Sequence, residues 1–184
     1  MIFSTIRVPP DPEFTAEVVI LLTTLGAARK EYNAGKRARD LLEIKRVHHK
    51  IIDFNRDARQ AGGGEPENAA IKKLTELDKL KTGADGDLVL PQIFIDGEYI
   101  GDATDLQGLE DDRQLDGILR RENCMACNHP RTRDSTQCPS CWVKFEEILP
   151  GMMSIEAVLE EIATREGEYD EDEYTDDEDE GFEG

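Results

Sequence analysis

The stretch of residues 88–119, LVLPQIFIDGEYIGDATDLQGLEDDRQLDGIL, decides the fold. It holds two β-prone runs, Gln92–Ile95 and 98–100, separated by Asp96 and Gly97. An Asp-Gly pair between two such runs is the strongest short-range signal for a β-hairpin. Pro91 stands directly before the first run, where a proline costs a ladder hydrogen bond unless the chain turns or the peptide bond is cis. We therefore expect a hairpin entered through Pro91.

After the hairpin, residues 102–119 predict one helix. Acidic residues occupy its first turns, where the helix dipole favours negative charge. Apolar residues recur at helical spacing and define one face. They are Leu106, Leu109, Leu115, Ile118 and Leu119.

The composition excludes some classes of function. The chain has 184 residues and a net charge of −19, from 22 basic and 41 acidic residues. Residues 166–184 contain 12 acidic residues and no basic one, so we expect a disordered acidic tail that favours solubility or contacts a basic partner. A chain this acidic is not expected to bind nucleic acid, because phosphate contacts need a Lys/Arg surface.

The four cysteines form the most specific chemical motif. They occur as two Cys-x-x-Cys pairs separated by ten residues, Cys124 with Cys127 and Cys138 with Cys141. Two such pairs complete a tetrahedral site of four thiolates, so residues 122–149 predict a short zinc ribbon with a structural Zn²⁺. An iron–sulfur centre or a redox dithiol is the alternative. His129 is a spare ligand that we interpret as a loop residue. Trp142 is expected to pack onto the ribbon.

The N-terminal part contains two apolar segments. Residues 1–6 predict the first strand, and residues 7–35 then form an insertion that the fold does not need. The apolar run 18–25 is too short to span a membrane. A signal peptide is disfavoured because Asp11, Glu13 and Glu17 precede this run, where a signal peptide is basic.

Further elements are expected in the middle and at the end of the chain. Residues 36–46 predict a helix, 47–54 a buried parallel strand, 66–81 an amphipathic helix and 150–165 a short helix. His48 and His49 open the predicted strand, and we interpret them as exposed residues without a metal role.

The hairpin stretch resembles the second half of a glutaredoxin, which combines a cis-proline, a hairpin and a Gly-x-x-x-Asp turn into the last helix. The matching residues are Leu90, Pro91, Phe94, Ile100, Gly101, Asp105 and Leu106. The sequence LLEIKRVHHKIIDFN at 41–55 also resembles the Src-homology-3-domain-binding glutamate-rich proteins, which lack the catalytic cysteines. The resemblance implies an α/β thioredoxin-like fold of order β-α-β-α-β-β-α in residues 1–121, followed by the ribbon and the tail.

The resemblance also bears on activity. Glutaredoxins carry a catalytic cysteine where the first strand leads into the first helix, whereas this chain has no cysteine before Cys124. The nearest residues that could replace the missing thiol are Ser4 and Thr5, which carry hydroxyl groups. We therefore expect a redox-inactive binding or adaptor protein whose partner is a protein. The alternatives are a glutathione-dependent oxidoreductase using Cys124 or Cys127, and a glutathione or iron–sulfur carrier.

By the same resemblance, a remnant glutathione groove would include four residues. The backbone of Leu90 and Pro91 would pair with the cysteinyl unit, and Thr104 and Asp105 would hold the γ-glutamyl end. Asp102, in place of a glycine, would repel the γ-glutamyl carboxylate. The clustered thiols fit a reducing compartment, so the sequence predicts a cytoplasmic protein without a membrane segment.

Overall fold

The structure is a computed structural model that describes residues 10–54, 69–151 and, nearer the C-terminus, 156, 159–160 and 162–164. The strand predicted at 1–6, the tail 166–184 that is expected to be disordered, and much of the helix predicted at 150–165 lie outside these residues. Among the described residues, no helix is both long and apolar enough to cross a membrane.

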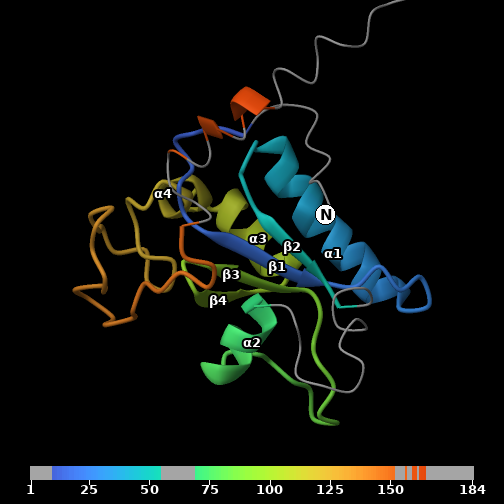
Figure 1. Ribbon diagram of the computed structural model, residues 1–184. Helices are drawn as coiled ribbons and strands as arrows, with labels where there is room; N and C mark the ends of the chain where they lie inside the picture. The colour runs from blue at the N-terminus through green and yellow to red at the C-terminus, as the bar shows by residue number, and fades with distance from the viewer. Residues whose placement is uncertain (1–9, 55–68, 152–155, 157–158, 161, 165–184) are drawn as a thin grey trace, which may run out of the picture.

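A four-stranded mixed sheet forms the centre of the fold, in the order β2-β1-β3-β4. Strand β1 (Val18–Leu22) pairs in parallel with β2 (Lys50–Asp53) and antiparallel with β3 (Gln92–Ile95). Strand β4 (Glu98–Gly101) pairs antiparallel with β3. With the helices between them, these strands give the β-α-β-α-β-β-α order of a thioredoxin-like fold, as predicted (Figure 1).

The central position of β1 corrects the interpretation of residues 7–35 as an insertion. All five residues of β1 are buried, and helix α1 (Arg29–Ile44) also begins inside this segment. The run VVILL is continuous because a strand in the middle of the sheet is covered on both faces. The first strand of the fold is therefore Val18–Leu22, and residues 1–6 are not needed for that role.

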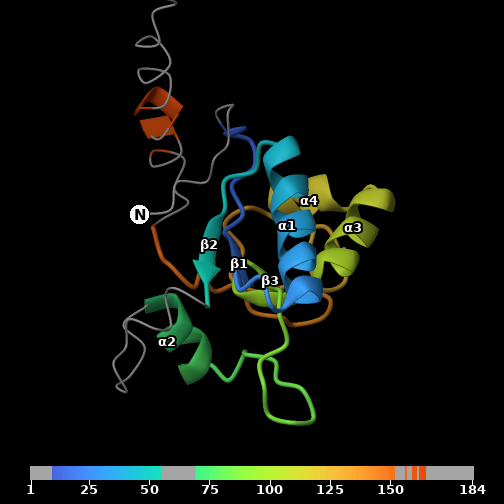
Figure 2. The ribbon, with the colours of Figure 1, turned by 90° about the vertical axis from the view of Figure 1, so that its right-hand side faces the viewer.

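The two faces of β1 separate the core into two clusters. Val18, Ile20 and Leu22 pack with α1, α3 (Ala103–Asp111) and α4 (Leu115–Leu119). Val19 and Leu21 pack on the other side with α2 (Ala69–Glu76). Figure 2 shows α2 on one side of the sheet, and α1, α3 and α4 on the other.

Several predicted boundaries differ from the structure. Helix α1 begins seven residues before the predicted 36–46, and Gly35 lies so close to Leu22 that a Cβ there would sit 3.0 Å from the Leu22 Cβ. Strand β2 begins at Lys50, so both histidines precede it. The prediction of exposed histidines is wrong for His49, which is buried with its Nδ1 2.8 Å from the Val47 carbonyl oxygen.

The hairpin region follows the prediction closely. The Leu90-Pro91 peptide bond is cis, and the hairpin has the predicted strands and turn. The single predicted helix 102–119 is instead divided into α3 and α4, with Arg113 at φ 59° between them. Asp102 caps α3 by accepting from the backbone N–H groups of Thr104 and Asp105.

Candidate metal centre and the cis-proline cavity

The four cysteines converge on one point. The Sγ atoms of Cys124 and Cys141 are 3.7 Å apart, and those of Cys127 and Cys138 are 3.6 Å apart. All four Sγ atoms lie within 4.8 Å of one another. Zn–S bonds of about 2.3 Å in a tetrahedron place sulfur atoms about 3.8 Å apart. The cluster could therefore bind a metal such as zinc.

Both Cys-x-x-Cys turns have the same backbone geometry. In each, the N–H of the first cysteine donates to the carbonyl five residues later, and the N–H four residues later donates back to that cysteine. The bonds, of 2.8–3.1 Å, are Cys124 to His129, Asn128 to Cys124, Cys138 to Val143 and Trp142 to Cys138. This repetition explains why both pairs point their sulfur atoms at one site.

The electrostatics of the thiols follow from burial and from backbone donors. Burial raises the pKa of Cys124 to about 12. Burial also acts to raise the pKa of Cys138, but the N–H groups of Cys141 and Ser140, with the neighbouring thiols, lower it to about 6. These N–H groups lie 3.5 and 3.4 Å from Cys138 Sγ and would stabilise a metal-bound thiolate.

Two residues near the thiols, Trp142 and His129, lie outside the thiol cluster. The prediction that Trp142 packs onto the ribbon is wrong, since its side chain is 69% exposed. It lies four residues after Cys138, directly behind the second turn, where the backbone is left-handed, with φ 65°. The spare candidate His129 contributes its carbonyl to the first turn and does not belong to the thiol cluster.

The cysteine-containing segment, residues 122–149, packs into the hydrophobic core on one face of the sheet. Cys124 and Cys138 are fully buried, and they and Met125 belong to the same cluster as α1, α3 and α4. Figure 1 shows this segment, in orange, beside the β3–β4 turn. The cysteines thus connect the end of α4 to the sheet.

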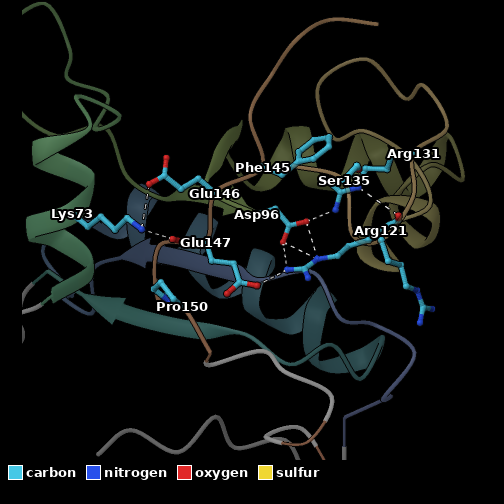
Figure 3. A pocket seen from close by; sticks show the side chains of 10 residues that line it. Lys73, Asp96, Arg121, Arg131, Ser135, Phe145, Glu146, Glu147 and Pro150 are labelled. Carbon is cyan, nitrogen blue, oxygen red and sulfur yellow. Dashed lines mark hydrogen bonds and ion pairs between the residues drawn. The ribbon is translucent and has the colours of Figure 1, made fainter. Parts of the chain in front are cut away.

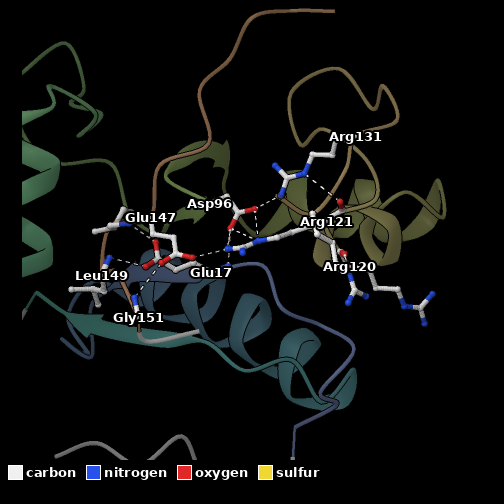
Figure 4. Close-up of polar contacts among 10 residues, drawn as sticks. Glu17, Asp96, Arg120, Arg121, Arg131, Glu147, Leu149 and Gly151 are labelled. Atoms are coloured by element: carbon white, nitrogen blue, oxygen red, sulfur yellow. Dashed lines mark hydrogen bonds and ion pairs between the residues drawn. The ribbon is translucent and has the colours of Figure 1, made fainter. Parts of the chain in front are cut away.

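Asp96, at the hairpin turn, is the main polar anchor of this segment. Its carboxylate is buried and accepts from Arg121 Nη2 at 2.6 Å, Arg131 Nη2 at 2.5 Å and the Glu17 N–H at 3.0 Å (Figure 4). Gly97 has φ 79°, and a Cβ there would overlap the Glu146 carbonyl oxygen. The Asp-Gly pair that predicts the hairpin therefore also holds the cysteine-containing segment on the sheet: Asp96 binds its arginines, and Gly97 leaves room for its backbone.

Residues 144–151 are fixed at several further points. The buried carboxylate of Glu17 accepts from the N–H groups of Ile148 at 2.6 Å and Leu149 at 2.7 Å. Glu147 pairs with Arg121 at 2.9 Å, and Lys73 of α2 donates to the Glu147 carbonyl at 2.5 Å (Figure 3). No sequence pattern predicts these contacts; their one signal is Glu17, an acidic residue directly before an apolar strand.

Glu17 gives a prediction for the pH dependence of stability. Burial raises its pKa above 4.5, opposed by the N–H donors of Ile148 and Leu149 and reinforced by Glu147 and Asp96. The folded protein therefore binds this proton more tightly than the unfolded chain, and the resulting stability is lost as pH rises through the raised pKa. The free energy of unfolding of the wild type, measured relative to Glu17→Gln, should fall between pH 4.5 and neutrality.

The control for this measurement is Glu13→Gln, since Glu13 is an exposed glutamate nearby. Taking the difference between wild type and variant removes the pH dependence of the metal centre, which both share. A difference that stays constant or rises with pH would contradict the raised pKa of Glu17.

A second candidate site lies beside the cis-proline. A cavity of about 630 Å³ is lined by Leu90, Pro91 and Thr104, together with Lys30 and Arg37 of α1. Three of the four residues that the glutaredoxin resemblance implied for a glutathione groove thus line one cavity. The fourth, Asp105, is not among the lining residues; its carboxylate accepts from the Asp102 N–H at 2.9 Å within the helix cap.

The place of the glutaredoxin thiol also needs correction. Since β1 ends at Leu22 and α1 begins at Arg29, the connecting residues 23–28, TTLGAA, occupy it in place of Ser4 and Thr5. Thr24 Oγ1 donates to Asp53 at 2.5 Å, and Thr23 Oγ1 accepts from the Leu25 N–H. These hydroxyls stabilise the connection and supply no thiol.

No protein-family model and no curated protein matches the chain. The assignment of the fold therefore rests on strand order, pairing and the cis-proline hairpin.

Proposed function

We propose that the protein is a redox-inactive, glutaredoxin-like binding protein whose four cysteines hold a structural zinc ion. The observation that carries the proposal is the convergence of four Sγ atoms with separations of 3.6 and 3.7 Å between partners. Four protein ligands fill a tetrahedral site, so no position remains for water or substrate. Paired Cys-x-x-Cys turns favour zinc over an iron–sulfur centre.

The absence of a thiol beside Pro91 supports the redox-inactive part of the proposal. A glutaredoxin needs a thiolate at the N-terminus of its first helix. Here that connection is TTLGAA, and all four cysteines of the chain belong to the cluster. We infer that the fold serves to present surfaces to a protein partner, with the exposed Trp142 on one of them. The reduced thiols fit a cytoplasmic location.

The matching test is a glutathione mixed-disulfide reduction assay. We expect no turnover above the uncatalysed rate, because zinc-bound thiolates in a closed site do not exchange and the residues beside Pro91 have no thiol. Metal content should be measured on the same sample. Turnover that disappears in Cys124→Ser or Cys127→Ser would show that the cluster is a redox centre.

A second candidate, a glutathione carrier, is favoured by one observation. Lys30 and Arg37 line the same cavity as Leu90, Pro91 and Thr104 and suit the carboxylates of a peptide, while four acidic residues in the same wall oppose such binding: Glu31, Asp85, Asp87 and Asp102. A glutathione titration separates the candidates. Saturable binding that is lost in Arg37→Gln but retained in Arg113→Gln, an exposed arginine outside this cavity, would favour the carrier.

A further inference from the structure

A different cavity, of about 450 Å³, lies between the cysteine-containing segment and α2 (Figure 3). Four cationic side chains contribute to its wall, against three carboxylates. The cations are Lys73, Arg121, Arg131 and Arg133. An excess of positive charge in one cavity is unexpected in a chain of net charge −19.

The carboxylates of the wall are already engaged. Asp96 binds both Arg121 and Arg131, and Glu146 lies 3.5 Å from Lys73. Arg133 donates its Nε to the Arg120 carbonyl at 3.2 Å, and no carboxylate of the described residues pairs with it. The uncompensated charge of the cavity therefore belongs to Arg133.

Arg131 provides a second and independent observation. Its side chain is only 1% exposed and stacks on Phe145, with the guanidinium carbon 3.8 Å from the ring centroid. Nη2 binds Asp96 and Nε faces the Arg121 carbonyl at 3.4 Å. Within the described part of the chain, Nη1 has no hydrogen-bond acceptor. A buried charged donor without an acceptor costs about 1–3 kcal/mol or more, so an acceptor from a ligand would stabilise it.

We propose that this cavity binds an oxyanion, a carboxylate or phosphate group, on Arg131 and Arg133. Guanidinium groups suit this ligand because their N–H donors match the spacing of two oxygen atoms. Phe145 stacks on the Arg131 guanidinium and Asp96 accepts from its Nη2, so Nη1 is the donor that lacks an acceptor. The site is separate from both the metal centre and the cis-proline cavity.

The oxyanion can come from two sources with the same chemistry. One is the chain itself: Pro150 lines the cavity, and the 12 acidic residues of 166–184 follow in the same chain. A tethered ligand of this kind acts at an effective concentration on the order of millimolar. The other source is a free anion such as inorganic phosphate. The experiment needs one arm for each source.

The test is a titration of the zinc-loaded full-length chain with inorganic phosphate. Binding is measured from the shifts of the arginine Nε–H signals in NMR spectra. The titration is run on the native chain and on a full-length form in which the acidic residues of 166–184 are replaced by amides. In the second form we expect saturable shifts of the Arg131 and Arg133 signals. Arg133→Gln should weaken phosphate binding about tenfold, the effect of losing one charge-assisted hydrogen bond.

Two further variants complete the design. Arg131→Lys keeps a cation beside Asp96 but lacks the planar fork, so it should also weaken binding. Arg113→Gln, which removes an exposed charge outside the cavity, should leave binding unchanged. Absence of saturation in the amide form, or equal weakening by Arg113→Gln and Arg133→Gln, overturns the site.

The two arms distinguish the sources. Arg131 and Arg133 signals that already differ between the two forms before phosphate is added, together with tighter phosphate binding in the amide form, show that the acidic segment occupies the site. Equal binding in both forms shows that the ligand is a free anion. Either result supports the oxyanion site.

Discussion

Cys138→Ser should abolish metal binding and lower the free energy of unfolding of the whole domain by more than about 3 kcal/mol. Structural zinc in small peptides contributes about 10–16 kcal/mol of apparent binding free energy, which becomes folding free energy. Removing one of four ligands forfeits most of it. The loss should extend beyond residues 122–149, whereas the sequence alone suggests that a separate ribbon would loosen and leave the rest folded.

The difference arises from where Cys138 lies. Cys138 and Cys124 are fully buried in the cluster that also contains Ile20 of β1 and Ile93 of β3. Without a metal, the two cysteine turns lose the centre that fixes them to each other. The ion pair between Arg131 and Asp96 then loses its positioning, because Arg131 lies between the two turns.

Three measurements check this expectation. Metal per chain should fall from about one to zero, the denaturation midpoint should decrease, and the amides of β1 and β3 should exchange faster with solvent. Ser140→Ala is the matched control, since Ser140 is exposed and only its backbone N–H faces Cys138 Sγ. Unchanged protection of β1 and β3 in Cys138→Ser would show that the cysteine segment is an independent module.

Features that depend on neighbouring residues could be predicted from the sequence. The Asp-Gly turn, the proline before the strand and the apolar spacing of 102–119 are local, and the structure contains the hairpin, the cis bond and the buried face. The convergence of the cysteines was equally accessible, because each Cys-x-x-Cys turn orients two sulfur atoms by itself.

Features that depend on distant partners could not be predicted in the same way. The run VVILL fits a strand buried on both faces, a helix core or a signal peptide, and only its pairing with β2 and β3 decides among them. Glu17 and Ile148 are 131 residues apart in sequence, so no pattern connects them. The ion pairs of Asp96 with Arg121 and Arg131 could not be predicted, because the hairpin turn alone already accounts for an aspartate at this position.

Asp96→Asn should destabilise the protein by about 3–5 kcal/mol, the usual cost of removing one partner of a buried ion pair. Its carboxylate is 3% exposed and serves two guanidinium groups, of which Arg131 is 1% exposed. Arg121 keeps Glu147 as a partner, whereas Arg131 pairs with no other carboxylate among the described residues. The asparagine amide would also place N–H donors where these cations need acceptors.

A double variant tests whether Asp96 and Arg131 depend on each other. In Asp96→Asn combined with Arg131→Met, only Arg121 still faces the amide, and it keeps Glu147 as a partner, so the pair should cost clearly less than the sum of the two single changes. Asp112→Asn removes an exposed carboxylate and should leave the free energy of unfolding unchanged within about 0.5 kcal/mol. If Asp96→Asn cost no more than Asp112→Asn, or if the two single changes were additive, the ion pair would not hold the cysteine segment on the sheet. The segment would then depend on the metal centre and on the contacts of Glu17 alone.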